Sequence, residues 1–197
     1  MSDNEQHVLD HFPSDPGVVP STLDFPVVGI GASAGGIVAL QRFLTELPSS
    51  TGMAFVIVLH LAPDQDSAMA AILQLRTRMP VMQVTGTVGI ERDHVYVIPP
   101  KQDLVMNDSA LHIVPAARTR GVRTAIDKFF RALAEVHRER AVGVILSGAG
   151  SDGAVGIARI KEMGGVTMAQ APDDAEHAGM PQSAIATGTV DFVLPVV

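Results

Sequence analysis

Three short runs of consecutive apolar residues, rich in Val and Ile, constrain the fold of this chain more than any other feature. They cover residues 27–31, 53–60 and 141–147, and each is far shorter than the roughly 18 residues that a membrane span needs. Strands with continuous apolar sequence are buried on both faces, which is typical of parallel sheets covered by helices. Segments with helical spacing of apolar residues follow the runs, as over 37–47. The sequence therefore predicts an α/β fold: a doubly wound, mostly parallel sheet with helices on both faces.

Shorter patterns between the second and third runs predict additional elements. Four short strands are expected near residues 81–84, 94–98, 104–106 and 111–114. Their close spacing and the turn residues Asn107 and Asp108 predict a small antiparallel meander. A helix is expected from residue 66 or 67 to about 79, where Pro80 ends it, and another over 123–137.

The first 25 residues differ in composition from the remainder of the chain. They contain five acidic residues and no Lys or Arg, and they show no periodicity, so we expect an acidic disordered tail or linker over 1–25. Residues 26–197 are long enough for one domain with a substantial core. The net charge of the whole chain is −7 and that of 26–197 is −2. A nearly neutral domain argues against nucleic acid as a partner, since nucleic-acid binding usually needs a concentrated basic face.

The residue types that are missing exclude several kinds of chemistry. The chain of 197 residues has no cysteine, which excludes disulfides, thiolate metal sites and a cysteine nucleophile. The N-terminus has neither the basic nor the apolar region of a signal peptide. We therefore expect a cytoplasmic protein that does not insert into membranes, and no motif predicts a cofactor or a metal.

The first loop that could carry chemistry follows the first apolar run. Its sequence, Gly31-Ala32-Ser33-Ala34-Gly35, fits G-x-S-x-G between a strand and a helix, the nucleophile-elbow pattern, with Ser33 as the nucleophile. The same stretch also fits the dinucleotide-binding pattern G-x-G-x-x-G/A. A dinucleotide fold expects an acidic residue at the end of the second strand, where this chain has His60. The hydrolase interpretation is therefore favoured, and a dinucleotide-binding oxidoreductase stays an alternative.

Two further loops supply candidate partners for Ser33. His60 ends the second apolar run, at the edge where α/β folds bind ligands. Asp152 lies in a glycine-rich loop after the third run, and capping of the following helix is an equally simple role for it. If the first strand is central and the other two flank it, Ser33, His60 and Asp152 come together at one edge of the sheet. No role is assigned to the other histidines, which are His7, His11, His94, His112, His137 and His177.

These loops together resemble the catalytic domain of the chemotaxis receptor protein-glutamate methylesterases (CheB). The matching stretches are VVGIGASAGG at 27–36, the strand ending in His60, VGVILSGAGSDGA at 142–154 and GMPQSAIATG at 179–188. The resemblance implies a methylesterase-like catalytic domain over 26–197, with Ser33 as nucleophile, His60 as base and Asp152 as the carboxylate that orients the base. Backbone N–H groups of Ala34 and Ala149 are then the candidates for the oxyanion hole.

The resemblance also implies a substrate and partners. Members of this family hydrolyse glutamyl γ-methyl esters on methyl-accepting chemotaxis receptors, releasing methanol, and some deamidate receptor glutamines; no cofactor is implied. Residues 1–25 cannot supply the receiver domain that usually precedes the esterase, so the sequence looks closer to the hybrid subfamily fused to a receptor methyltransferase. A regulatory or binding module with a weak or gated triad is the other alternative.

Basic residues between 118 and 140 outnumber acidic ones. A solvated helix face is the favoured interpretation. A basic rim that attracts glutamate-rich receptor helices is the alternative. The residues concerned are Arg118, Arg120, Arg123, Lys128, Arg131, Arg138 and Arg140.

Overall fold

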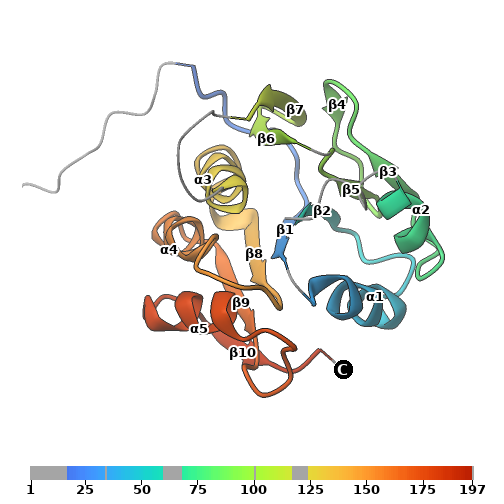
Figure 1. Cartoon of the computed structure of the whole chain (residues 1–197). Coiled ribbons are helices and arrows are strands. Elements are labelled where there is room, and N and C mark those ends of the chain that lie inside the picture. The colour runs from blue at the N-terminus through green and yellow to red at the C-terminus, as the bar shows by residue number, and fades with distance from the viewer. Residues whose placement is uncertain (1–16, 34, 60–67, 100, 117–123, 197) are drawn as a thin grey trace, which may run out of the picture.

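A sheet of seven parallel strands forms the centre of the molecule in a computed structural model of the chain (Figure 1). The structure describes residues 17–33, 35–59, 68–99, 101–116 and 124–196. The strand order is β10-β9-β8-β1-β2-β5-β3. Strands β1 (Val27–Ala32), β2 (Ala54–Leu59) and β8 (Ala141–Ile145) are the three apolar runs. The prediction that the first run is central, with the other two on either side, is therefore confirmed.

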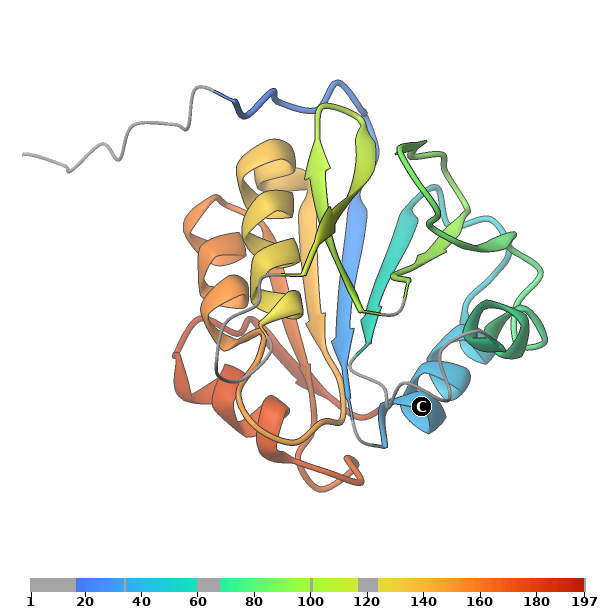
Figure 2. The same ribbon diagram turned by 45° about the horizontal axis from the view of Figure 1, so that its top comes forward.

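The central strands β1 and β2 bury both of their faces, as the continuous apolar runs predict. Along β1, Val27 contributes to one hydrophobic core, whereas Val28 and Ile30 contribute to a second core on the opposite face. Helices α3 (Ala125–His137), α4 (Ala154–Glu162) and α5 (Gly179–Ala186) cover the first core. Helices α1 (Gly36–Glu46) and α2 (Met69–Gln74) cover the second. Figure 2 shows the two helical layers on either side of the sheet. The expected doubly wound architecture is thus confirmed.

Helix α3 contributes the largest share of aromatic burial. Phe129 and Phe130 are both fully buried, with ring centroids 6.4 Å apart in an edge-to-face arrangement. Burying one such side chain stabilises the fold by about 1.5–3 kcal/mol. The spacing of apolar residues in 125–137 explains why this segment is a helix whose apolar face lies on the sheet.

The small antiparallel sheet exists, but two of the four strands expected in it lie elsewhere. Its strands are β4 (Val88–Gly89), β7 (Ala110–Pro115) and β6 (Gln102–Asn107), in that order. The segments near 81–84 and 94–98 instead form β3 (Val81–Gln83) and β5 (Val95–Val97), parallel strands at the end of the main sheet. All three residues of β5 are fully buried beside β2. A three-residue strand is too short for its sequence to show which sheet it joins.

Helix α2 is shorter than predicted and ends at Gln74 rather than near Met79. The Gln74 side chain replaces the backbone bonds that a longer helix would make. Its Nε2 donates to the carbonyl oxygens of Thr77 and Met79, and its Oε1 accepts the N–H of Val81. Residues 60–67, where the helix was expected to begin, lie outside the described part of the chain.

The last strands close the other side of the sheet. They are β9 (Val166–Gln170) and β10 (Phe192–Leu194), and a short 3-10 helix (Arg138–Arg140) joins α3 to β8. No helix in the described ranges is long and apolar enough to cross a membrane.

The described part of the N-terminal segment, residues 17–25, lies against the domain. Val18 and Leu23 pack on the first core, and Phe25 is buried in it. The N–H of Ser21 donates to the carbonyl of Val136 over 2.9 Å. Residues 1–16 lie outside the described part, so the expected acidic tail stays a prediction.

Candidate active site

Ser33 lies directly after β1, at the carboxyl edge of the central strand. Its N–H donates to the carbonyl of Ser147 over 3.0 Å, and its own carbonyl accepts the N–H of Gly36 over 2.8 Å. The first bond ties the turn to the loop after β8, and the second begins helix α1. Gly35 has φ +72°, a left-handed backbone conformation that glycine adopts without strain. The turn predicted from the sequence thus forms, with the Ser33 side chain half-buried.

The loop after β8 approaches Ser33 closely. A Cβ atom at Gly148 would lie 3.0 Å from the Cβ of Ser33 and would collide with the sulfur of Met180. A side chain at this position would therefore have to displace the Met180 side chain and press on Ser33. The same loop continues to Asp152, so the nucleophile turn and the carboxylate loop touch at Gly148.

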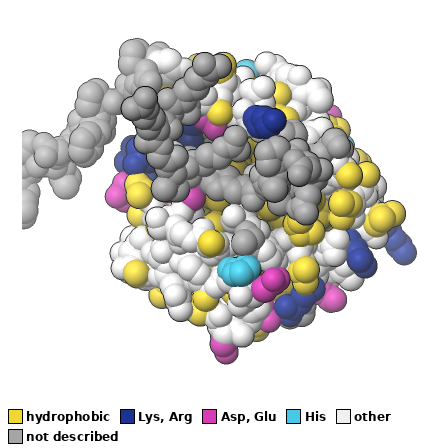
Figure 3. Space-filling model, in the orientation of Figure 1, with side chains coloured by type: hydrophobic (Ala, Val, Ile, Leu, Met, Phe, Trp, Pro, Cys, Tyr) yellow, Lys and Arg dark blue, Asp and Glu magenta, His cyan; other side chains and the backbone are white. Residues whose placement is uncertain are grey.

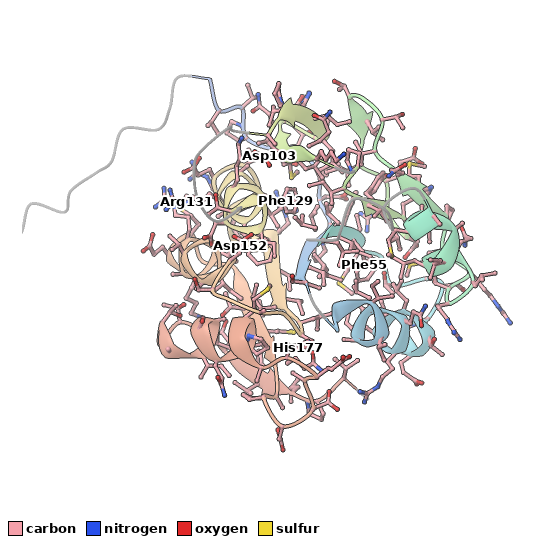
Figure 4. The ribbon with its side chains drawn as sticks, viewed as in Figure 1. Phe55, Asp103, Phe129, Arg131, Asp152 and His177 are labelled. Atoms are coloured by element: carbon pink, nitrogen blue, oxygen red, sulfur yellow. The ribbon has the colours of Figure 1, made fainter. Side chains whose placement is uncertain are left out.

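Asp152 is a buried carboxylate that binds the start of α3. Its Oδ2 accepts the N–H of Ile126 and its Oδ1 accepts the N–H of Asp127, each over 3.0 Å. Helix α3 needs this external acceptor because Thr124, its N-cap residue, makes no side-chain cap bond. Figure 4 shows Asp152 beside α3 and α4.

The capping role weighed for Asp152 is therefore real, although the helix it caps differs. The predicted cap was for α4, the helix that follows in the sequence, and the observed cap is for α3, about 26 positions earlier. A carboxylate has roughly four lone-pair sites, so two backbone bonds do not use all of its capacity. Capping and orientation of a histidine are thus compatible in this residue.

His60 follows β2 directly and lies outside the described residues. What the structure describes is the strand that leads to it. Leu59, the last residue of β2, pairs with Ala32, the last residue of β1, in a parallel register. Ser33 and His60 are the next residues of these two strands. Their meeting remains a prediction.

Of the two oxyanion-hole candidates, the structure describes only Ala149. Within the described ranges, no hydrogen-bond acceptor takes its N–H, whereas the N–H of the neighbouring Gly148 donates to the carbonyl of His177 over 2.9 Å. Ala149 is also exposed to solvent. A free N–H on an exposed loop that touches Ser33 can stabilise a developing negative charge. Ala34 lies outside the described residues.

The sequence prediction missed the loop after β9, which forms one wall of this region. His177, to which no role was assigned, donates its N–H to the Oγ of Ser147 over 3.0 Å. The Glu176 carboxylate lies beside the nucleophile turn, since a Cβ at Gly35 would be 2.9 Å from its Oε2. Figure 3 shows a histidine and an acidic side chain side by side on this face, and Figure 4 labels His177. The stretch 179–188, which carries part of the family resemblance and begins two residues after His177, could have drawn attention to this loop.

Buried polar groups connect the loop after β8 to the loop after β9. The side-chain oxygen of Gln170 accepts the N–H of Ser147 over 2.8 Å, and its Nε2 donates to the carboxylate of Asp174. Gln170 and Ser147 are both buried. The position of the Ser147–Asp152 loop is therefore fixed from below by β9.

The basic rim falls largely outside the described residues, since Arg118, Arg120 and Arg123 are not among them. Lys128 makes a 2.7 Å ion pair with Asp103 on β6, so its charge is neutralised locally. The described part of the chain holds no cluster of His, Asp or Glu side chains suited to a metal ion.

Comparison with known proteins agrees with this architecture. The CheB methylesterase family model matches residues 28–197. A putative protein-glutamate methylesterase/protein-glutamine glutaminase of Leptospira interrogans is 37% identical over 173 residues, covering 87% of this chain and 90% of the relative. An enzyme of Pyrococcus horikoshii named protein-glutamate methylesterase/protein-glutamine glutaminase is 32% identical over 183 residues, 91% of this chain but 50% of that protein.

Two further matches concern a solved structure and a longer protein. The crystal structure of the Thermotoga maritima CheB methylesterase catalytic domain superposes with a TM-score of 0.81 at 27% identity, covering 88% of this chain and 94% of that one. An uncharacterized 104.1 kDa protein of Rhodobacter capsulatus is 41% identical over 128 residues, 65% of this chain and 13% of that protein. The matches support neither a dinucleotide-binding oxidoreductase nor a purely regulatory module.

Proposed function

The chain belongs to the CheB methylesterase family, and we propose that it hydrolyses glutamyl γ-methyl esters on chemotaxis-type receptors with Ser33, His60 and Asp152 as its triad. The observation that carries this proposal is the strand order, with β8 and β2 on either side of β1. The loops bearing the three residues leave adjacent parallel strands at the same edge of the sheet. That edge is where α/β folds bind their ligands.

The proposed reaction has two stages, formation of a glutamyl ester on Ser33 and its hydrolysis by water. Ser33 Oγ attacks the γ-carbonyl carbon while His60 takes its proton, which gives a tetrahedral oxyanion. The intermediate collapses, the C–O bond to the methoxy group breaks, and His60 returns the proton so that methanol leaves. A water molecule then attacks the glutamyl ester of Ser33 with His60 as base, releasing glutamate and restoring the hydroxyl.

Other groups of the site stabilise charge during these steps. We propose that the Asp152 carboxylate holds the imidazole of His60 in orientation and stabilises its cation. The N–H groups of Ala34 and Ala149 are the proposed oxyanion donors, each worth about 3 kcal/mol of transition-state stabilisation. With a glutamine side chain as substrate, the same steps release ammonia, the activity named in the relatives above as protein-glutamine glutaminase.

Methanol release from a methylated receptor fragment and labelling by a fluorophosphonate probe test the proposal. We expect Ser33→Ala to abolish labelling and to lower turnover by about 10⁴-fold or more. Ser151→Ala, in the exposed part of the Asp152 loop, is the matched control and should behave like the wild type. A folded wild-type protein that neither reacts with the probe nor releases methanol would favour the regulatory module, and tight NAD binding would favour the oxidoreductase.

A pair of histidine variants tests the identity of the base. We expect His60→Ala to lower turnover by about 10³-fold or more. His177→Ala should stay within a few fold of the wild type, because the His177 backbone, rather than its ring, bonds the loop at Ser147 and Gly148. The reverse order of effects would show that His177 is the base.

The partners are also proposals. We expect methyl-accepting receptors as substrates and a fused methyltransferase as the neighbouring domain. The match of this chain to 13% of the 104.1 kDa relative supports the occurrence of an esterase-like domain within a longer chain, without naming the other domains. Determination of the coding sequence on both sides of this stretch tests the fusion, which a methyltransferase on neither side would exclude. We also propose a cytoplasmic location, which the lack of cysteine favours.

A further inference from the structure

At the starts of helices α3 and α4, a carboxylate from each helix start accepts backbone N–H groups of the other helix. Neither helix has a side-chain cap of its own, because Thr124 and Gly153 make no such bond. Asp152, just before α4, accepts the N–H groups of Ile126 and Asp127 in the first turn of α3. In return, the Oδ1 of Asp127 accepts the N–H of Gly156 in the first turn of α4, over 2.7 Å. Each carboxylate therefore satisfies the free donors of the other helix.

The two helix starts also touch, so that a movement of one is transmitted to the other. A Cβ atom at Gly156 would lie 2.6 Å from the Cβ of Phe130 and 3.0 Å from the Cα of Asp127. Phe130 is fully buried against the sheet and cannot move aside. Helix α4 is therefore packed directly on the backbone of α3 at the turn that carries Asp127.

Burying two carboxylates close together costs free energy, which suggests that the arrangement has a role. Desolvation is the main cause that raises the pKa of Asp127, and the nearby Asp152 carboxylate raises it further. The N–H groups of Gly156 and Gly153 and the Arg131 guanidinium act in the opposite direction and favour the ionised form. Figure 4 shows Asp152 and Arg131 around this part of α3. Two carboxylates thus lie close together with backbone donors as their main compensation.

We propose that Asp127 is a positioning residue for ester hydrolysis, which holds the start of α4 so that Asp152 keeps the orientation required toward His60. This inference rests on the proposed function, in which Asp152 belongs to the triad. Asp127 acts only through Asp152, since its bonds go to the backbone of α4. The proposal therefore predicts that its effect on turnover depends on the Asp152 carboxylate.

A double-mutant cycle with the whole chain tests this dependence. We expect Asp127→Ala to lower kcat about 10-fold or more with little change in KM, because α4 loses its acceptor. Asp127→Asn should recover kcat to within about threefold, since the amide oxygen still accepts the N–H of Gly156. In the Asp152→Asn background, Asp127→Ala should lower the residual rate less than twofold. Effects that multiply in the double variant would overturn the proposal.

The control alters the same two helices away from their starts. Glu135 on α3 pairs with Arg159 on α4 over 3.5 Å, and Glu135→Gln should leave kcat within twofold. A folded Asp127→Ala with wild-type kcat, an Asn variant as slow as the Ala variant, or an equal loss in Glu135→Gln would each overturn the inference. Wild-type turnover in Asp152→Asn would instead overturn the proposed triad, so the two failures are distinguishable.

Discussion

The two ends of helix α3 are built from opposite chemistry. At its start, the buried carboxylate of Asp152 accepts two backbone N–H groups. At its end, the buried ring of His137 donates from Nε2 to the carbonyl of Phe25 over 2.8 Å. The first end lies at the edge of the sheet that carries Ser33, and the second fixes the segment that leads into β1.

The difference indicates that the start of α3 serves the proposed active site, whereas its end anchors the segment before β1. The carboxylate of Asp152 accepts backbone N–H groups at the positive end of the helix dipole, which suits its proposed role toward His60. At the other end, burial lowers the pKa of His137, and its Nδ1 has no hydrogen-bond partner among the described residues. A neutral imidazole can donate one bond to a carbonyl, but it offers no charge. We therefore expect changes at the start of α3 to affect catalysis and changes at its end to affect stability alone.

The largest expected effect comes from Asp152→Ala. Turnover should fall by about 10³–10⁴-fold because the imidazole loses its orienting carboxylate. The free energy of unfolding should also fall by about 2 kcal/mol, since two N–H groups of α3 lose their acceptor. Methanol release and urea unfolding measure the two effects separately.

His137→Ala is the matched variant at the other end of the helix. It should lower the free energy of unfolding by a similar amount and leave kcat within about twofold. If both variants reduced turnover equally, the two ends would not differ in function, and the comparison would be wrong.

The sequence predicted the parts of this comparison that depend on local patterns. The apolar runs predicted β8, β1 and β2 as buried strands of a parallel sheet, whose order was assumed from the doubly wound topology, and the small residues around Ser33 predicted a tight turn. The bond from Asp152 to α3 could not be predicted, because it joins residues about 26 positions apart that only the packed fold brings together. His177 was missed for the same reason, since its bonds to Ser147 and Gly148 also span about 30 positions.

The next effect concerns Gly153, which lies between Asp152 and α4 with φ +93°. A Cβ atom there would collide with the Ile145 side chain and lie 2.9 Å from Cγ2 of Ile126. Gly153→Ala should therefore lower the free energy of unfolding by about 2–4 kcal/mol, through backbone strain and overpacking together. Thermal unfolding with circular dichroism measures it.

Gly150→Ala provides the control for the strain alone. Gly150 has φ +85° in the same loop, but a Cβ atom there meets nothing within 4 Å. Its cost should be about 1–2 kcal/mol, the backbone part only. Equal losses in both variants would show that contact with α3 and β8 does not hold the Asp152 loop.

A smaller effect is expected from pH at the end of α3. Desolvation is the main cause that lowers the pKa of His137 below 6.5; the bond to Phe25 opposes this, Arg140 lowers the pKa further, and Glu139 raises it. Below pH 6.5 the unfolded chain binds this proton more readily than the folded chain. Stability should therefore fall with acidification through this window, by at most about 1.4 kcal/mol per pH unit from this residue.

Unfolding of the wild type and of His137→Gln at pH 7.5 and 5.5 isolates the contribution of His137. The glutamine can still donate to Phe25 but does not titrate, so the difference between the two pH values should shrink. His112→Gln, which removes a ring that bonds Thr87 in the small sheet, is the control for replacing a histidine by glutamine. An unchanged pH dependence in His137→Gln would show that this end of the helix is not sensitive to protonation.

The smallest expected effect is an increase in the free energy of unfolding, and it concerns Arg138, the residue after α3. Its φ of 51° and ψ of −124° match the first central position of a type II′ turn, where glycine is strongly preferred. The Arg138 side chain is exposed, so its removal loses no core packing. Arg138→Gly should therefore raise the free energy of unfolding by about 0.5–1 kcal/mol and leave kcat unchanged.

Arg140→Gly, two residues later, should have the reverse effect. Arg140 lies in a 3-10 turn, where glycine only increases the entropy of the unfolded chain, so a loss of about 0.5–1 kcal/mol is expected. At the start of α4, the positive-φ position beside Asp152 is already glycine, whereas the end of α3 keeps a strained arginine. Stabilisation is thus available at the anchoring end without touching the catalytic end. A fall in turnover on Arg138→Gly would show that the two ends of α3 are coupled after all.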